Sequence, residues 1–162
     1  MKWKNKIFQN QTNNSFEAIA LEVFKYQAKN NNVYKTYLNL LNVNINNVKN
    51  LGQIPFLPIE FFKHQDVVCK SNNIDTVFTS SGTSGSQSKH IIKDLGVYKK
   101  SFTSGFEYFY GNIMDYTILA LLPSYIERSG SSLVYMCEKF MKYSGKKENG
   151  FYLNEHQELS NL

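Results

Sequence analysis

Residues 78–90 read Phe-Thr-Ser-Ser-Gly-Thr-Ser-Gly-Ser-Gln-Ser-Lys-His, a run of hydroxyl and glycine residues closed by a lysine and a histidine. Glycine allows left-handed backbone angles and close approach to a ligand, while amides and hydroxyl groups donate hydrogen bonds to anionic oxygens. Lys89 adds a positive charge. Residues 75–79 and 89–93 have the composition of short strands. These features predict a phosphate-binding loop between two strands, and a flexible linker is the alternative.

Three common motifs are excluded, two of them by the spacing within this loop. The residues from Gly82 to Lys89 do not fit G-x-x-x-x-G-K-S/T, and no helix is expected directly after them, so the P-loop and the dinucleotide fingerprint both fail. The G-x-S-x-G motif of α/β-hydrolases is also absent from the sequence.

The loop instead resembles the signature of adenylate-forming enzymes, roughly Thr/Ser-Ser-Gly-Ser/Thr-Thr-Gly-x-Pro-Lys, a strand-loop-strand element that holds the phosphates of ATP. Gln87 stands where proline is usual, and Lys89 comes one residue late. The resemblance implies ATP and Mg²⁺ as cofactors, without protein residues that bind a resident metal. The residues implied to bind ATP are Ser80, Ser81, Gly82, Thr83, Ser84, Gly85, Ser86 and Lys89.

Two further segments narrow the resemblance to one family. Residues 54–63 read Ile-Pro-Phe-Leu-Pro-Ile-Glu-Phe-Phe-Lys, and residues 122–136 read Leu-Pro-Ser-Tyr-Ile-Glu-Arg-Ser-Gly-Ser-Ser-Leu-Val-Tyr-Met. With the glycine loop between them, they resemble the acyl-protein synthetase family in the family's own order. That family includes the fatty-acid-activating subunit of the bacterial bioluminescence fatty-acid reductase.

The resemblance implies ATP-dependent activation of a long-chain fatty acid as an acyl-adenylate, followed by transfer to a protein thiol. The implied acceptor is a reductase or an acyl carrier protein. An acyl-CoA or aryl-CoA ligase is the alternative enzyme. A non-catalytic module that binds a nucleotide or a carrier protein is the alternative outside enzymes.

The motifs do not identify the catalytic residues, for which Lys89, His90 and Arg128 are the candidates. Arg128 is the only arginine, and a planar bidentate donor suits an anionic substrate, although a pair with Glu127 explains it equally well. His90 follows Lys89 directly and is otherwise an exposed strand residue. Tyr125 is the candidate wall of the acyl pocket, or an ordinary core tyrosine. Residues 129–132 open a predicted helix, whose free amides suit an anion or a simple cap.

Composition predicts a packed cytoplasmic protein that does not bind nucleic acid and does not span a membrane. The 162 residues are 42% hydrophobic and 15% aromatic, and the net charge of +5 comes from short, scattered lysine runs. No apolar run reaches the length of a signal peptide or a membrane span. Cys69 and Cys137 are expected to be free, structural thiols, because they form no motif.

Apolar spacing and strand composition predict an α/β fold. The family resemblance implies that this is the N-terminal part of an adenylate-forming fold, with a mixed sheet flanked by helices. Residues 1–66 are expected to be a helical segment and residues 67–162 an α/β segment with parallel strands. Besides the two strands flanking the loop, strands are expected at 67–70, 116–122 (buried) and 151–153. Helices are expected at 15–30, 33–41, 59–64, 95–109, 131–143 and 155–162.

The last predicted helix stops without a glycine or proline terminator. Together with the family resemblance, this predicts that the chain is an inactive N-terminal portion that self-associates through exposed apolar surface. A compact, standalone domain is the alternative.

Overall fold

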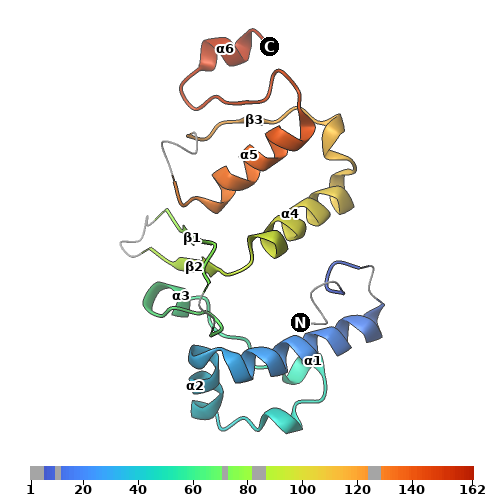
Figure 1. Ribbon diagram of the computed structural model, residues 1–162, viewed down its shortest axis with the longest axis vertical. Helices are drawn as coiled ribbons and strands as arrows, with labels where there is room; N and C mark the ends of the chain where they lie inside the picture. Colours follow the sequence, from blue (N-terminus) through green and yellow to red (C-terminus); the bar gives the residue numbers. More distant parts are fainter. Residues whose placement is uncertain (1–5, 10–11, 71–72, 82–86, 124–128) are drawn as a thin grey trace. The chain divides into compact units, whose positions relative to one another are not determined.

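The computed structural model describes residues 6–9, 12–70, 73–81, 87–123 and 129–162 (Figure 1). The chain divides into two compact units. Unit 1 comprises Met1–Val77 and Gly82–Val97, and unit 2 comprises Phe78–Ser81 and Tyr98–Leu162. Each unit has its own core and is described separately.

Unit 1 begins with two helices, α1 (Asn13–Asn30) and α2 (Asn32–Leu40). The N-cap of α1 is Thr12, whose hydroxyl accepts a 3.3 Å hydrogen bond from the Ser15 amide, so the helix starts earlier than the predicted residue 15. Asn31 ends α1 and caps α2, its side-chain oxygen accepting from the Tyr34 amide. One asparagine is therefore both the C-cap of α1 and the N-cap of α2.

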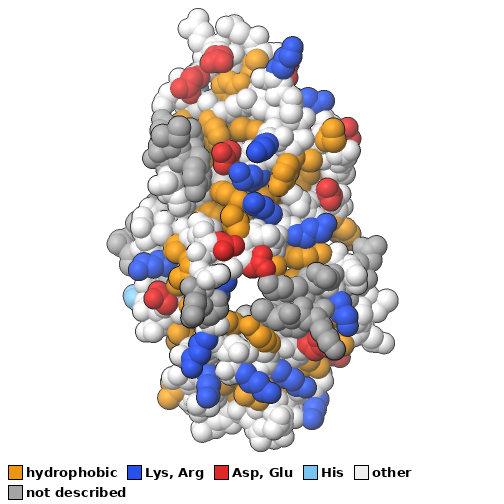
Figure 2. Space-filling model, viewed as in Figure 1, with side chains coloured by type: hydrophobic (Ala, Val, Ile, Leu, Met, Phe, Trp, Pro, Cys, Tyr) orange, Lys and Arg blue, Asp and Glu red, His pale blue; other side chains and the backbone are white. Residues whose placement is uncertain are grey.

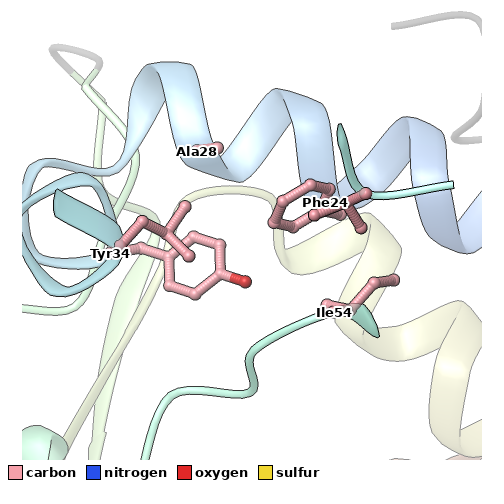
Figure 3. Packing of buried hydrophobic residues seen from close by; sticks show 6 residues of the cluster. Phe24, Ala28, Tyr34 and Ile54 are labelled. Atoms are coloured by element: carbon pink, nitrogen blue, oxygen red, sulfur yellow. The ribbon is translucent and has the colours of Figure 1, made fainter. Parts of the chain in front are cut away.

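The core of unit 1 is formed by the apolar faces of α1 and α2 together with the segment that follows them (Figure 3). Phe24 and Ala28 lie one turn apart on α1, and Tyr34 packs edge-on against Phe24 with ring centroids 6.1 Å apart. The buried members of the cluster are Phe24, Ala28, Tyr34, Leu38, Val48 and Ile54.

The segment after α2 contributes Val48 and Ile54 to this core and is also bound through its backbone. It contains the 3-10 turns η1 (Ile45–Asn47) and η2 (Leu51–Gln53) and the short helix α3 (Phe61–His64). The Tyr34 hydroxyl donates a 2.6 Å hydrogen bond to the Pro55 carbonyl. The helix expected at 59–64 is shorter than predicted and begins at Phe61, three residues after Pro58.

Strands β1 (Thr76–Thr79) and β2 (Lys89–Ile92) form a two-stranded sheet, which confirms the two strands predicted around the loop. The predicted strand at 67–70 is wrong, because only Cys69 makes a β-bridge there, with Asn31. A single bridge to a helix junction cannot extend into a ladder.

Unit 2 contains most of the long helix α4 (Leu95–Tyr110), followed by the 3-10 turn η3 (Ile113–Asp115) and strand β3 (Leu119–Ala120). Helix α5 (Ser132–Ser144), strand β4 (Gly150–Phe151) and helix α6 (His156–Ser160) complete it. Helix α5 starts at the Ser131 cap and ends at Gly145, whose φ of +64° suits a left-handed C-terminal residue.

Aromatic rings fill the core of unit 2. Phe78, the third residue of β1, lies 5.0 Å from Tyr98 and 5.5 Å from Tyr135 between ring centroids. Phe106 and Phe140 pack 4.8 Å apart and join α4 to α5. Two apolar residues of these helices lie outside the core: Phe109, in the last turn of α4, is 76% exposed, and Leu133 is exposed in the first turn of α5.

Strands β3 and β4 pair in parallel, with α5 between them in sequence, so the predicted parallel βαβ arrangement is present. Leu119 pairs with Gly150 and Ala120 with Phe151. The expected buried strand at 116–122 is only two residues long, and Leu119 and Leu121 are exposed. The strands of the described residues form two separate pairs, so the α/β class holds while a single mixed sheet is not seen.

Charged side chains do not form a continuous basic strip on the face in Figure 2, where lysines are dispersed among acidic and hydrophobic side chains. Among the described residues, no helix combines the length and apolarity needed to cross a bilayer.

Candidate functional site

The first side of the glycine loop is anchored in unit 2. Phe78 is 3% exposed in the aromatic core, so the backbone entering the loop starts from a fixed point. The Thr79 amide donates a 2.9 Å hydrogen bond to the Gly130 carbonyl. Gly130 has φ +85°, a left-handed conformation that favours glycine. Two segments singled out in the sequence, the loop and the residues that open α5, are therefore joined by a main-chain hydrogen bond.

Ser80 and Ser81 follow this anchor, and the Ser81 side chain is exposed. The other predicted loop residues, Gly82, Thr83, Ser84, Gly85 and Ser86, lie outside the described residues. The structure thus describes the first part of the candidate loop and the strand before it.

The second side of the loop leads into β2 in unit 1. Lys89 and His90 are exposed at the start of this strand, and Ile92 is buried at its end. The His90 ring packs edge-on against Phe62 of α3, with centroids 5.8 Å apart. This partial burial lowers the pKa of His90. The lowered pKa favours the neutral imidazole, which can donate one hydrogen bond and carries no full charge.

Lys93, one residue beyond β2, donates a hydrogen bond to the Cys69 carbonyl. The Cys69 thiol in turn donates to the Gln27 side-chain oxygen at 3.1 Å. These contacts tie the end of β2 to α1 and give Lys93 a structural role. Lys89 keeps its exposed position at the loop, where a cation can reach an anionic ligand.

The opening of α5 contains a helix cap in its described part. The Ser131 hydroxyl accepts from the Val134 amide at 3.4 Å and so satisfies one of the free amides of the first turn. The predicted substrate residues Tyr125 and Arg128 lie outside the described residues, as does Glu127.

The two cysteines are free and poorly suited to accept an acyl group. Burial raises the pKa of Cys69, with Lys93 acting in the opposite direction, and burial alone raises the pKa of Cys137. A thiol with a raised pKa forms little thiolate near neutral pH. Among the described residues, no cluster of three or more His, Cys, Asp or Glu side chains could hold a metal ion.

Sequence reasoning did not single out Gly130 as the partner of the loop, nor Phe62 as the neighbour of His90. Both contacts join residues far apart in the sequence. Phe62 did lie in the segment at 54–63 whose pattern was noted, but its pairing needed the fold.

Comparison with known proteins gives one match. The family model described as "Acyl-protein synthetase, LuxE" matches residues 5–118, which include the segment at 54–63 and the whole glycine loop. The segment at 122–136 lies beyond the matched range. Searches of curated proteins and of solved structures gave no match.

Proposed function

We propose a function for this chain because it belongs to the acyl-protein synthetase family. In this proposal the protein activates a long-chain fatty acid with ATP as an acyl-adenylate and passes the acyl group to a protein thiol. The family match across the glycine loop is the observation that supports the proposal most strongly, because it covers the segment with phosphate-binding chemistry.

The loop would bind the ATP phosphates through the amides and hydroxyls of residues 80–86, with Lys89 adding charge. The contacts of Phe78 and Thr79 on one side, and of β2 on the other, support this role. Donors on an anchored backbone need less reorganisation when pyrophosphate leaves and charge develops. Mg²⁺ bound with the nucleotide would neutralise part of the phosphate charge. An adenylate-forming fold and a cytoplasmic location are parts of the same proposal.

The nucleotide step is tested first by calorimetry of ATP–Mg²⁺ binding to the 162-residue chain and to its Gly82→Val and Thr83→Ala variants. We expect each substitution to weaken ATP binding about tenfold or more, because one to two charge-assisted hydrogen bonds to the phosphates are lost. Gly52→Ala is the control, because an added Cβ there would meet Asn50 at an ordinary 3.6 Å. No binding by the parent chain, or equal binding by all variants, would contradict the assignment.

The reaction is tested by fatty-acid-dependent exchange of pyrophosphate into ATP, using the protein at its natural length. Exchange that disappears in the Gly82→Val variant supports acyl-adenylate formation. Coenzyme A and a thiol protein are then offered separately as acyl acceptors. Transfer to coenzyme A would favour the acyl-CoA ligase, and ATP binding without exchange would favour the non-catalytic module.

A further inference from the structure

One face of helix α4 is exposed and carries two adjacent rows of residues. Lys100, Ser104 and Glu107 follow at spacings of four and three, so they lie on one line along the helix. Ser101, Gly105 and Tyr108 form the neighbouring row with the same spacing. Tyr108 is 79% exposed, and the side chains of Lys100 and Glu107 are exposed as well.

The second row combines one large side chain with an open space. A Cβ added at Gly105 would meet nothing within 4 Å in the described part of the chain. Glycine inside a helix costs roughly 1 kcal/mol relative to alanine. Packing within the described chain therefore gives no reason for a glycine here, and the surface beside it has room for a ring.

We propose that a second copy of this chain packs antiparallel against this face of α4. A two-fold axis near the middle of the helix, between Thr103 and Ser104, places Lys100 of each copy opposite Glu107 of the other. The same axis places Tyr108 of each copy level with Lys99 of the other, so that its ring, which leans toward its own N-terminus, lies over Ser101 and points toward the space at Gly105. Each contact then occurs twice, as symmetry requires of an isologous interface.

Charge complementarity selects the second copy as the occupant. Lys100 and Glu107 are seven residues apart, about 10 Å along the axis, too far for their charges to pair within one helix. In an antiparallel partner helix the two charges meet, because Lys100 and Glu107 lie at equal distances on opposite sides of the two-fold axis. A lipid surface would not favour Glu107 beside the exposed ring, since anionic headgroups repel carboxylates.

The contact is small. A 16-residue helix is about 24 Å long, and one helix face buries less than the ~800 Å² per partner of a standard interface. The dimer is accordingly expected to be weak and to dissociate in the micromolar range, with an affinity that falls as salt screens the charge pairs.

Sedimentation equilibrium over a concentration series tests the proposal on the full chain and three variants. Lys100→Glu and Glu107→Lys each place like charges together twice per dimer and should weaken association about tenfold or more. The double variant Lys100→Glu/Glu107→Lys restores opposite charges and should recover the parent dissociation constant to within about threefold. Circular dichroism confirms that α4 stays folded.

Tyr108→Ser should also weaken the dimer, whereas Tyr143→Ser, at a 40% exposed tyrosine on α5, serves as the matched control. A monomer at all concentrations would overturn the proposal. A dimer unaffected by either charge reversal would also overturn it, because another surface would then hold the copies together. Failure of the double variant to recover would exclude the antiparallel register.

Discussion

The Thr79 amide donates to the Gly130 carbonyl across 51 residues of sequence, and this hydrogen bond joins the entrance of the glycine loop to the start of α5. Gly130 accepts this bond in a left-handed conformation, with a φ of +85°, which favours glycine over other residues. The family match contains Thr79 but ends before Gly130. The loop is therefore supported by a residue beyond the part that identifies the family.

Replacing Gly130 with alanine should lower both stability and ATP affinity. The left-handed conformation costs a non-glycine residue about 1–2 kcal/mol, so either unit 2 is destabilised by that amount or the carbonyl turns away from Thr79. Urea unfolding and ATP calorimetry measure the two effects. A Gly130→Ala protein with unchanged stability and unchanged ATP binding would show that this bond does not support the loop.

Replacing Gly150 with alanine should destabilise unit 2 by about 1–3 kcal/mol through overpacking. An added Cβ would lie 2.7 Å from the Tyr152 ring, whose hydroxyl is fixed by a 2.8 Å hydrogen bond to the Glu148 carbonyl. Urea unfolding measures the loss. In a Tyr152→Ala background the same substitution should be nearly neutral; an equal cost in both backgrounds would assign the effect to the strand backbone.

Stability should decline between pH 10 and 12 through Tyr34. Burial, and secondarily the neighbouring Tyr37, raises the pKa of Tyr34 from 10.0 to about 12. In that range Tyr34 loses its hydroxyl proton in the unfolded chain but keeps it in the folded chain. The stability that the protonated side chain contributes is therefore complete below pH 10 and is lost as pH rises through 12. Tyr34→Phe should remove this part of the pH dependence, as measured by urea unfolding.

The same Tyr34→Phe variant should be about 1–2 kcal/mol less stable at pH 7, because the partly buried Pro55 carbonyl loses its donor. Tyr37→Phe is the control, since its hydrogen bond to the Phe56 carbonyl is long at 3.4 Å and exposed. Equal losses in both variants would contradict the special role of Tyr34.

Phe62→Ala should raise the pKa of His90 toward its ordinary 6.5, because the ring that buries one side of the imidazole is removed. In the parent protein the depressed pKa contributes stability that is complete above pH 6.5 and declines as pH falls through the folded value. NMR titration of His90 measures the shift. Phe61→Ala, at a ring that packs on Tyr37 instead, should leave it unchanged; equal shifts would indicate displacement of α3 as a whole.

Local signals in the sequence predicted the long helices well. The apolar spacing of α1, α4 and α5 is decided within a few residues of each position, and so are the approximate bounds of these helices. The strands beside the loop were also predictable. Residues 67–70 and 116–122 were not, because a strand exists only where a partner backbone lies alongside, and composition does not contain that information.

The polar contacts that organise unit 2 could not be read from the sequence either. Asn149 accepts from the Ile118 amide at 2.8 Å and donates to the Met141 carbonyl and the Ser144 hydroxyl. Nothing distinguishes this asparagine in a chain rich in asparagine. Its importance comes from three partners brought together by folding, as does the pairing of Thr79 with Gly130.

The attachment of Pro55 and Phe56 through their carbonyls has an evolutionary consequence. Every amino acid has a main-chain carbonyl, so the tyrosine hydroxyls of α2 recognise these positions whatever side chain they bear. The Phe56 side chain is 72% exposed and is free to diversify, whereas Tyr34 is constrained to remain a hydroxyl donor of the same length. Homologues are expected to conserve the tyrosine and to vary residue 56, which makes that position available to selection for whatever the surface meets.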